Sequence, residues 1–269
     1  MSTIKQKGVA LVTGASSGIG AVYADRLAKR GYDLILVARK QARLEALAAR
    51  LTAETGRTVE TLVADLNNPD DLSKVEARLR ADAAITLLVN NAGVGAVTPI
   101  LASDVDKMDE MISLNVTALT RLTYAAAPGF VARGNGAFVN IASIVAIAPE
   151  LLNGVYGGSK AFVLAFSQSL HHELAGKGVR VQAVLPGATA TEFWDLAGHP
   201  VQNFPASFVM SAEDMVDAAL SGFDQGEIVT IPALPEQAEW DAYEATRRGM
   251  GGRLSSSTPG RRYLAGIAV

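Results

Sequence analysis

Short, continuous apolar runs alternate with longer segments of helical composition along most of this chain, and this alternation limits the possible folds most strongly. Continuous apolar runs are typical of strands that are covered on both faces. Strands that alternate with helices form a parallel sheet, because each connection must cross over the sheet. We therefore predict an α/β fold: a doubly wound parallel sheet of the Rossmann type, with about seven strands and helices on both faces in three α/β/α layers.

The expected elements follow from the same pattern. The predicted strands are 9–12, 34–37, 59–63, 87–89, 137–141, 179–184 and 228–231. The predicted helices are 19–30, 41–55, 70–81, 104–132, 155–176 and 212–223.

Two regions depart from the alternation. Residues 188–210 hold five large apolar side chains among glycines and prolines, which predicts a lid or pocket wall. Residues 249–260 are rich in Gly and Ser, and no acidic residue follows Glu244. We predict one catalytic domain over 1–248, including the lid, and a C-terminal tail over 249–269. The tail is either flexible or an arm that packs on a neighbouring subunit.

Composition excludes several classes of function. The formal net charge of −3 argues against nucleic acid and anionic membranes as partners. The absence of cysteine excludes disulfides, thiolate metal sites and a cysteine nucleophile. Residues 1–7 are polar, with no visible signal peptide, and no apolar run approaches the ~20 residues of a membrane span. We expect a soluble, cytoplasmic protein without a metal site.

A glycine-rich turn follows the first predicted strand and opens the first predicted helix. Gly14, Gly18 and Gly20 there permit a tight turn and a close approach of the backbone to a pyrophosphate. The helix N-terminus adds free N–H groups and a partial positive charge. This position between strand and helix predicts a dinucleotide site rather than a purely structural turn.

The end of the second predicted strand bears on which dinucleotide binds. A carboxylate at this point would bind the ribose 2′-OH of NAD, whereas an arginine accommodates the 2′-phosphate of NADP. Here Arg39 and Lys40 end the strand, and Asp33 lies at its other end. The sequence therefore predicts NADP(H), with a solvated surface arginine as the alternative for Arg39.

Tyr156 and Lys160 lie four residues apart and so share one face of a predicted helix. A free tyrosine titrates near ~10 and is a poor base at neutral pH. We expect Lys160 and an oxidised nicotinamide to lower the pKa of Tyr156 by about three units, which takes roughly 4 kcal/mol. Tyr156 would then serve as a general acid/base. The alternative for such a pair alone is an ordinary helix surface contact.

Together these residues resemble a short-chain dehydrogenase/reductase of the short, single-domain branch. The matching pieces, in the family's order, are 13–20, Asp65, 90–93, Asn115, Ser143, Tyr156, Lys160, 186–187 and Thr191. The resemblance implies that Tyr156 is the acid/base, that Ser143 binds the substrate oxygen, and that Lys160 binds the nicotinamide ribose. It also implies that Asn115 holds a water that relays protons from Lys160.

The resemblance further implies a cofactor and a substrate set. The implied cofactor-binding residues are Gly14, Ser16, Ser17, Gly18, Ile19, Gly20, Arg39, Lys40, Asp65, Leu66, Asn91, Ala92, Gly93, Tyr156, Lys160, Pro186, Gly187, Thr189 and Thr191. The expected substrate pocket comprises Val94, Ser143, Val145, Leu152, Phe193 and Trp194. Its mainly apolar lining predicts an apolar body around the reacting carbonyl. We interpret His171 and His172 as surface or packing residues and Glu192 as a solvated charge.

These observations predict an NADP(H)-dependent oxidoreductase that interconverts a carbonyl and a secondary alcohol on a small molecule. The alternatives are a 3-oxoacyl-thioester reductase, an NAD-linked alcohol dehydrogenase and a non-catalytic NADP-binding regulatory protein. The core resembles 3-oxoacyl-thioester reductases, but residues 226–232 lead into a polar, helix-like stretch over 236–248 in place of their usual closure. By analogy with the family, we expect a homodimer or homotetramer.

Overall fold

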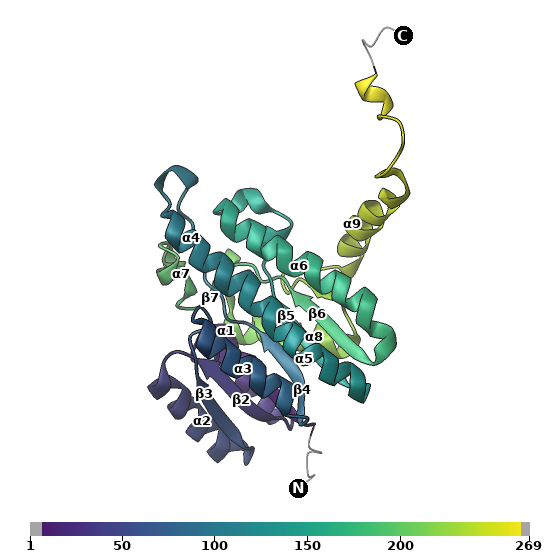
Figure 1. Cartoon of the computed structure of the whole chain (residues 1–269). Coiled ribbons are helices and arrows are strands. Elements are labelled where there is room, and N and C mark those ends of the chain that lie inside the picture. Colours follow the sequence, from purple (N-terminus) through teal and green to yellow (C-terminus); the bar gives the residue numbers. More distant parts are fainter. Residues whose placement is uncertain (1–6, 265–269) are drawn as a thin grey trace. The chain divides into compact units, whose positions relative to one another are not determined.

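Seven parallel strands form the central sheet in the computed structural model, which describes residues 7–264 (Figure 1). Along the sheet the order is β3-β2-β1-β4-β5-β6-β9. The strands are β1 (Val9–Thr13), β2 (Asp33–Ala38), β3 (Val59–Val63), β4 (Ile85–Asn90), β5 (Gly136–Ile141), β6 (Val179–Val184) and β9 (Val229–Thr230). The predicted doubly wound, Rossmann-type sheet is confirmed. Its order reverses between β1 and β4, and the crevice at such a point is where ligands bind in this class of sheet.

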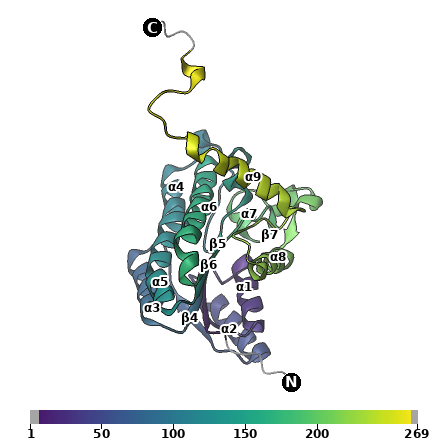
Figure 2. The same ribbon diagram turned by 90° about the vertical axis from the view of Figure 1, so that its right-hand side faces the viewer.

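Helices cover both faces of this sheet. The longer ones are α1 (Gly18–Lys29), α2 (Gln41–Thr55), α3 (Pro69–Ala81), α4 (Val105–Ile112), α5 (Leu119–Arg133), α6 (Gly154–Leu174) and α8 (Ala212–Gln225). Figure 2 shows the layers edge-on, with α3, α5 and α6 on one side of the strands and α1 and α8 on the other. The core clusters agree with this arrangement and place α2 beside α1 and α8.

Alternate side chains of each strand feed two separate hydrophobic cores. In β1, Ala10 and Val12 pack with α1 and α8, whereas Leu11 packs with α3 and α5 on the opposite face. This follows from the two-residue period of a strand. Because helices cover both faces, both sets of side chains must be apolar. This explains why the strands appear in the sequence as continuous apolar runs.

The helix predicted over 104–132 contains a local irregularity. A turn of π-helix, Ser113–Ala118, joins α4 to α5 without interrupting the helical path. It carries Asn115, which is buried. Single π turns inside α-helices occur frequently at functional sites, and the extra residue here turns a polar side chain inward.

A small second sheet pairs the two ends of the segment predicted as a lid. Strand β7 (Thr189–Ala190) pairs in parallel with β8 (Met210–Ser211). Between them lie the short helix α7 (Phe193–Leu196) and two 3₁₀ turns, Val201–Asn203 and Ala206–Phe208.

The described chain separates into two compact units, which divide between Pro232 and Ala233. The second unit contains α9 (Gln237–Gly249) and two 3₁₀ turns, Gly251–Arg253 and Arg261–Tyr263. Within α9, Trp240 stacks on Tyr243 with ring centroids 5.2 Å apart. The domain limits of 1–248 and 249–269 stay predictions, and their ends at 1–6 and 265–269 lie outside the described residues.

A buried carboxylate joins α3 to α5 on one face of the sheet. Glu76 on α3 accepts a hydrogen bond from Arg80 at 2.6 Å and another from Arg121 of α5 at 2.5 Å. Burial would raise the pKa of Glu76, but the hydrogen bonds from the two arginines outweigh it and lower that pKa. The ionised form of Glu76 therefore stabilises the folded chain.

We predict that Glu76→Gln lowers the free energy of unfolding by about 1–3 kcal/mol at pH 7, the usual effect of losing charged hydrogen bonds at a buried group. Because the folded-state pKa is lowered, this contribution is present above the unfolded pKa and is lost as the pH falls through the folded value. Denaturant titrations from pH 7 to pH 3 should show the gap to the parent closing. Glu110→Gln, an exposed change on α4, is the control; a gap of constant size would contradict the prediction.

Candidate active site

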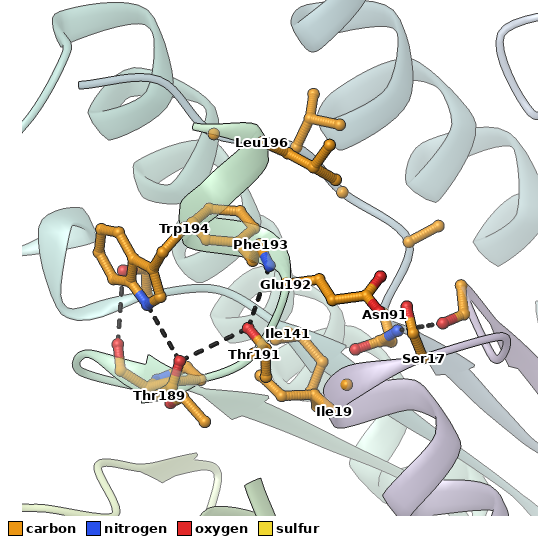
Figure 3. Close-up of a pocket in the computed structure, with 18 of the residues that line it drawn as sticks. Ser17, Ile19, Asn91, Ile141, Thr189, Thr191, Glu192, Phe193, Trp194 and Leu196 are labelled. Carbon is orange, nitrogen blue, oxygen red and sulfur yellow. Dashed lines mark hydrogen bonds between the residues drawn. The ribbon is translucent and has the colours of Figure 1, made fainter. Parts of the chain in front are cut away.

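A cavity of roughly 580 Å³ opens at the carboxyl ends of the strands, beside the point where the strand order reverses. It is lined by the glycine-rich turn, the ends of β2, β4 and β5, the start of α6 and the lid. The close-up in Figure 3 shows Ser17, Ile19 and Asn91 on one side and Thr189, Phe193 and Trp194 on the other.

Most of the residues predicted for the site lie in this one cavity wall. All six predicted substrate-pocket residues line it, as do the predicted catalytic residues Ser143, Tyr156 and Lys160. Of the predicted cofactor set, Gly20 is outside the lining, and so is the predicted proton-relay residue Asn115. Both contact residues that line the cavity. Gly20 lies against Gly14 and Asn91, and Asn115 is hydrogen-bonded to Val94.

The turn after β1 requires glycine for two different reasons. Gly14 and Gly18 have φ values of +65° and +53°, which side chains rarely tolerate. Gly20 has an ordinary helical conformation, but a Cβ there would lie 2.3 Å from the Gly14 carbonyl oxygen and 2.5 Å from Nδ2 of Asn91. Its contribution is therefore a close approach of α1 to the turn rather than a contact with the cavity.

Asn91 and Thr13 connect the ends of β4 and β1. The Thr13 hydroxyl accepts hydrogen bonds from the backbone N–H groups of Asn91 and Ala92, each at 3.0 Å, and donates to the Val89 carbonyl at 3.2 Å. The Asn91 side chain donates to the Thr13 carbonyl at 2.8 Å. These bonds hold the two loops that border the crevice at a set separation.

The end of the cavity beside the glycine-rich turn contains two cationic side chains. Arg39 and Lys40 line it, and the Arg39 side chain is 65% exposed, with Asp65 as a distant partner at 3.8 Å. Ser17 caps α1 without using its side chain, and no acidic residue stands in the first turn of that helix. Free N–H groups and an available guanidinium are what a diphosphate with a further phosphate requires.

Ser143 and Tyr156 meet at the opposite end. Ser143 follows β5, and its hydroxyl donates to the Pro186 carbonyl at 3.4 Å. Tyr156 lies in the first turn of α6, which Asn153 begins by accepting from the N–H groups of Val155 and Tyr156. A hydrogen bond with the Ser143 side chain acts on the Tyr156 phenol.

Burial favours the neutral form of both members of the Tyr156–Lys160 pair. It raises the pKa of Tyr156 to about 12, and the hydrogen bond with Ser143 only partly opposes this. Burial also lowers the pKa of Lys160 to about 8. The lowering expected for the tyrosine pKa depends on Lys160 together with an oxidised nicotinamide, and it stays a prediction.

Lys160 is fully enclosed and directed toward the sheet. Its Nζ donates to the Ile141 carbonyl at 2.8 Å and lies 5.8 Å from the Tyr156 ring centroid. A Cβ added to Gly93 would lie 3.5 Å from this Nζ and 3.0 Å from Oδ1 of Asn115. Gly93 thus leaves room for both polar groups beside the end of β4.

Asn115 is connected to the cavity wall by hydrogen bonds to Val94 and Ser159. Its Oδ1 accepts from the Val94 N–H at 3.0 Å, and its Nδ2 donates to the Val94 carbonyl at 2.9 Å and to the Ser159 hydroxyl at 3.1 Å. Ser159 in turn donates to the Tyr156 carbonyl at 2.8 Å. The π turn therefore connects the loop after β4 to the turn of α6 that carries the tyrosine.

Aromatic side chains of the segment predicted as a lid line the cavity next to Tyr156. Phe193 lies 5.8 Å from the Tyr156 ring, and Trp194 packs on Phe193 and on Phe204 at 5.4 and 4.7 Å between centroids. The Trp194 indole donates to the Thr189 carbonyl at 3.0 Å, as Figure 3 shows. The apolar Leu196 and Phe208 also line the cavity, at 79% and 73% exposure.

Two features of the site were not predicted from the sequence. Gly95 faces Phe193 so closely that a Cβ there would lie 2.2 Å from the ring. Glu192, interpreted as a solvated charge, lines the cavity and accepts from Arg43 at 2.7 and 3.1 Å. The two partners are 149 positions apart, so no local pattern could have indicated this pair.

Comparison with known proteins identifies the class that this fold and site define. The sequence profile of the short chain dehydrogenase family matches residues 8–200. The chain therefore belongs to the short-chain dehydrogenase/reductase family of oxidoreductases.

Two solved structures show the similarity over almost the whole chain. A short-chain dehydrogenase from Sphingobium yanoikuyae in complex with NADPH has 51% identity and a TM-score of 0.92, over 95% of this chain and 99% of that one. The bulky-bulky ketone specific alcohol dehydrogenase from Comamonas testosteroni has 44% identity and a TM-score of 0.89, over 97% and 100% of the two chains.

Among curated proteins, the very-long-chain 3-oxoacyl-CoA reductase of Bos taurus is 36% identical over 76% of this chain. That of Anas platyrhynchos is 38% identical over 68% of it. The chain spans only 66% and 60% of the lengths of these two reductases.

The described residues 7–264 contain neither a candidate membrane span nor a candidate metal cluster. No helix in this range is long and apolar enough to cross a membrane. Nor does the same range hold a group of three or more His, Cys, Asp or Glu side chains that could bind a metal ion.

We predict that Gly20→Ala lowers the free energy of unfolding by about 1–3 kcal/mol, as overpacking does when backbone must move. Its new methyl would meet the Gly14 carbonyl and Asn91. The matched control is Gly158→Ala in α6, where a Cβ meets nothing within 4 Å. That change should be neutral or stabilising by up to about 1 kcal/mol. Urea titrations of both variants measure the difference, and equal effects would refute the close approach at Gly20.

Proposed function

We propose that this protein is an NADP(H)-dependent carbonyl reductase that interconverts a bulky, largely apolar ketone and its secondary alcohol. The observation that carries this proposal is the single cavity wall that joins Ser143, Tyr156 and Lys160 to the glycine-rich turn and Arg39. A regulatory nucleotide-binding protein would not need the buried phenol beside a serine hydroxyl.

The residues present fit an NADP(H) cofactor. The open first turn of α1, with Ser17 as a cap that makes no side-chain bond, suits the pyrophosphate. Arg39 and Lys40 suit the 2′-phosphate, and Asp65 and Leu66 border the adenine side. The NADPH complex of the Sphingobium relative supports this choice. When bound, the cofactor supplies the hydride, and the protein supplies position and protons.

In the proposed reduction, Tyr156 donates its proton to the carbonyl oxygen while Ser143 hydrogen-bonds that oxygen and stabilises its developing charge. Burial raises the pKa of Tyr156 to about 12, so the phenol is protonated at neutral pH and ready to donate. Lys160 would hold the ribose side of the cofactor. Asn115 holds the turn that carries Tyr156 and supports proton return through a bound water.

The lid supports the choice of substrate. Phe193, Trp194 and Phe204 form a continuous aromatic wall next to Tyr156, and the rim residues Leu151, Leu196 and Phe208 are apolar and exposed. An apolar wall and rim favour a ketone with two large substituents over one joined to a charged carrier. The Comamonas relative is described as specific for bulky-bulky ketones, which are ketones with two large substituents.

The substrate class is tested by a panel read at the nicotinamide absorbance with NADPH. Diaryl and aryl-alkyl ketones should be reduced with higher kcat/KM than acetone-sized ketones or 3-oxoacyl thioesters. A preference for 3-oxoacyl-CoA would assign the chain to the activity of its curated relatives. No turnover across the panel would favour the regulatory alternative.

We predict that Tyr156→Phe lowers kcat by about 100- to 10,000-fold, the range expected on loss of a general acid. The ring stays in place beside Phe193, so NADPH affinity, measured by fluorescence titration, should change by less than about threefold. Tyr124→Phe, an exposed tyrosine on α5, is the control. Turnover near the parent rate in Tyr156→Phe would remove this residue from the mechanism.

We predict that Arg39→Asp lowers kcat/KM for NADPH at least about tenfold relative to NADH. The substitution removes a cation from the 2′-phosphate of NADPH and places a carboxylate beside it. Steady-state rates at limiting cofactor give this ratio directly. Arg57→Asp makes the same change outside the cavity lining and should leave the ratio unchanged. An unaltered preference in Arg39→Asp would place 2′-phosphate recognition elsewhere.

A further inference from the structure

Gly95 lies in the loop after β4, and its missing side chain leaves room for one aromatic ring of the segment predicted as a lid. A Cβ added to Gly95 would lie 2.2 Å from Cζ of Phe193 and 3.0 and 3.1 Å from the two neighbouring ring carbons. Both residues line the cavity. Gly95 does not have a positive φ, so it is the position of the ring, and not backbone strain, that opposes a side chain there.

The backbone that carries Phe193 is held on both sides. The residue before it, Glu192, accepts hydrogen bonds from Arg43 of α2 at 2.7 and 3.1 Å. The residue after it, Trp194, donates through its indole to the Thr189 carbonyl at 3.0 Å. Trp194 also packs edge-on against the Phe193 ring, and Figure 3 shows these two rings side by side. Because these contacts hold α7 in place, the ring itself must respond to anything placed on the loop after β4.

The Phe193 ring borders the place where the proposed carbonyl lies. Its centroid is 5.8 Å from that of the Tyr156 ring. The ring also packs against the buried cluster of Ala96, Met111, Val145 and Tyr156. Close-packed side chains leave no space in those directions, whereas the cavity offers it. A ring displaced from the loop after β4 would therefore enter the cavity beside the phenol.

We infer that Gly95 is a specificity-determining residue of the proposed reduction, because its missing side chain keeps Phe193 away from Tyr156 and so admits the second large substituent of the ketone. This inference rests on the proposed function. A methyl group at position 95 would move the ring toward the phenol and narrow the cavity where that substituent lies. In an apolar pocket, a difference of one methylene between substrates changes kcat/KM by about 10- to 200-fold.

Two ketones that differ in one substituent test the inference. Butyrophenone has a phenyl and a propyl group, and acetophenone has a phenyl and a methyl group. We expect Gly95→Ala to lower the ratio of kcat/KM for butyrophenone to that for acetophenone at least about fivefold, with NADPH as cofactor. NADPH affinity, measured by fluorescence titration, should change by less than about threefold. A ratio that is unchanged or raised in Gly95→Ala would overturn the inference.

The matched control is Gly176→Ala, which adds the same methyl group outside the cavity lining, where a Cβ meets nothing within 4 Å. This variant should keep the parent ratio for the two ketones.

A double-mutant cycle assigns the effect to the ring. In the Phe193→Ala background no ring faces position 95, so Gly95→Ala should then change the ratio by less than about twofold. A fivefold effect that persists in this background would refute Phe193 as the cause. Phe193→Trp leaves Gly95 intact and enlarges the ring, so it should lower the ratio as well. It keeps the inference open to test if Gly95→Ala does not fold, and a ratio that is not lowered would contradict it.

These outcomes separate the inference from the proposed function. A parent protein that reduces neither ketone would refute the proposed function. A parent that reduces both, with a ratio that does not respond to Gly95→Ala, would refute the role of Gly95 alone.

Discussion

The hydrogen bonds of Thr13 with the loop after β4 hold together the part of the structure on which the site depends. One hydroxyl accepts from two successive N–H groups and donates to a carbonyl, so the ends of β1 and β4 are joined where the strand order reverses. Asn91 adds a bond back to β1. The glycine-rich turn, the start of α1 and the crevice all take their positions from this junction, because backbone groups that diverge there would otherwise remain unpaired.

Burial is the second constraint, and it sets the charge state of the acid/base pair. Desolvation raises the pKa of Tyr156 and lowers that of Lys160, so it favours the neutral form of each. The Ser143 hydroxyl opposes this at the tyrosine, and the Ile141 carbonyl holds the lysine. Both groups are therefore removed from bulk water, and charge that develops on them interacts more strongly than it would in water.

The two ends of the sheet differ in chemistry for a topological reason. At the carboxyl ends, glycines and helix N-termini leave N–H groups free for an anion. At the amino-terminal edge, α1 and α8 end and the strands begin, and a small cavity there is lined by Tyr23, Arg30 and Arg180. Helix α1 contributes to both ends, with Gly18 at one and Tyr23 and Arg30 at the other.

The sequence by itself determined the sheet and the glycine-rich turn, because apolar period and turn chemistry are local properties. The grouping of Ser143 with Tyr156 and Lys160 came from the resemblance to a known family. The tertiary structure alone decided the rest. It placed Gly20 against a carbonyl, set Asn115 in a π turn and paired Glu192 with Arg43. It also showed that burial raises the pKa of Tyr156 in the chain by itself. These outcomes depend on close approach and on the exclusion of water by segments far apart in the chain, which no local pattern records.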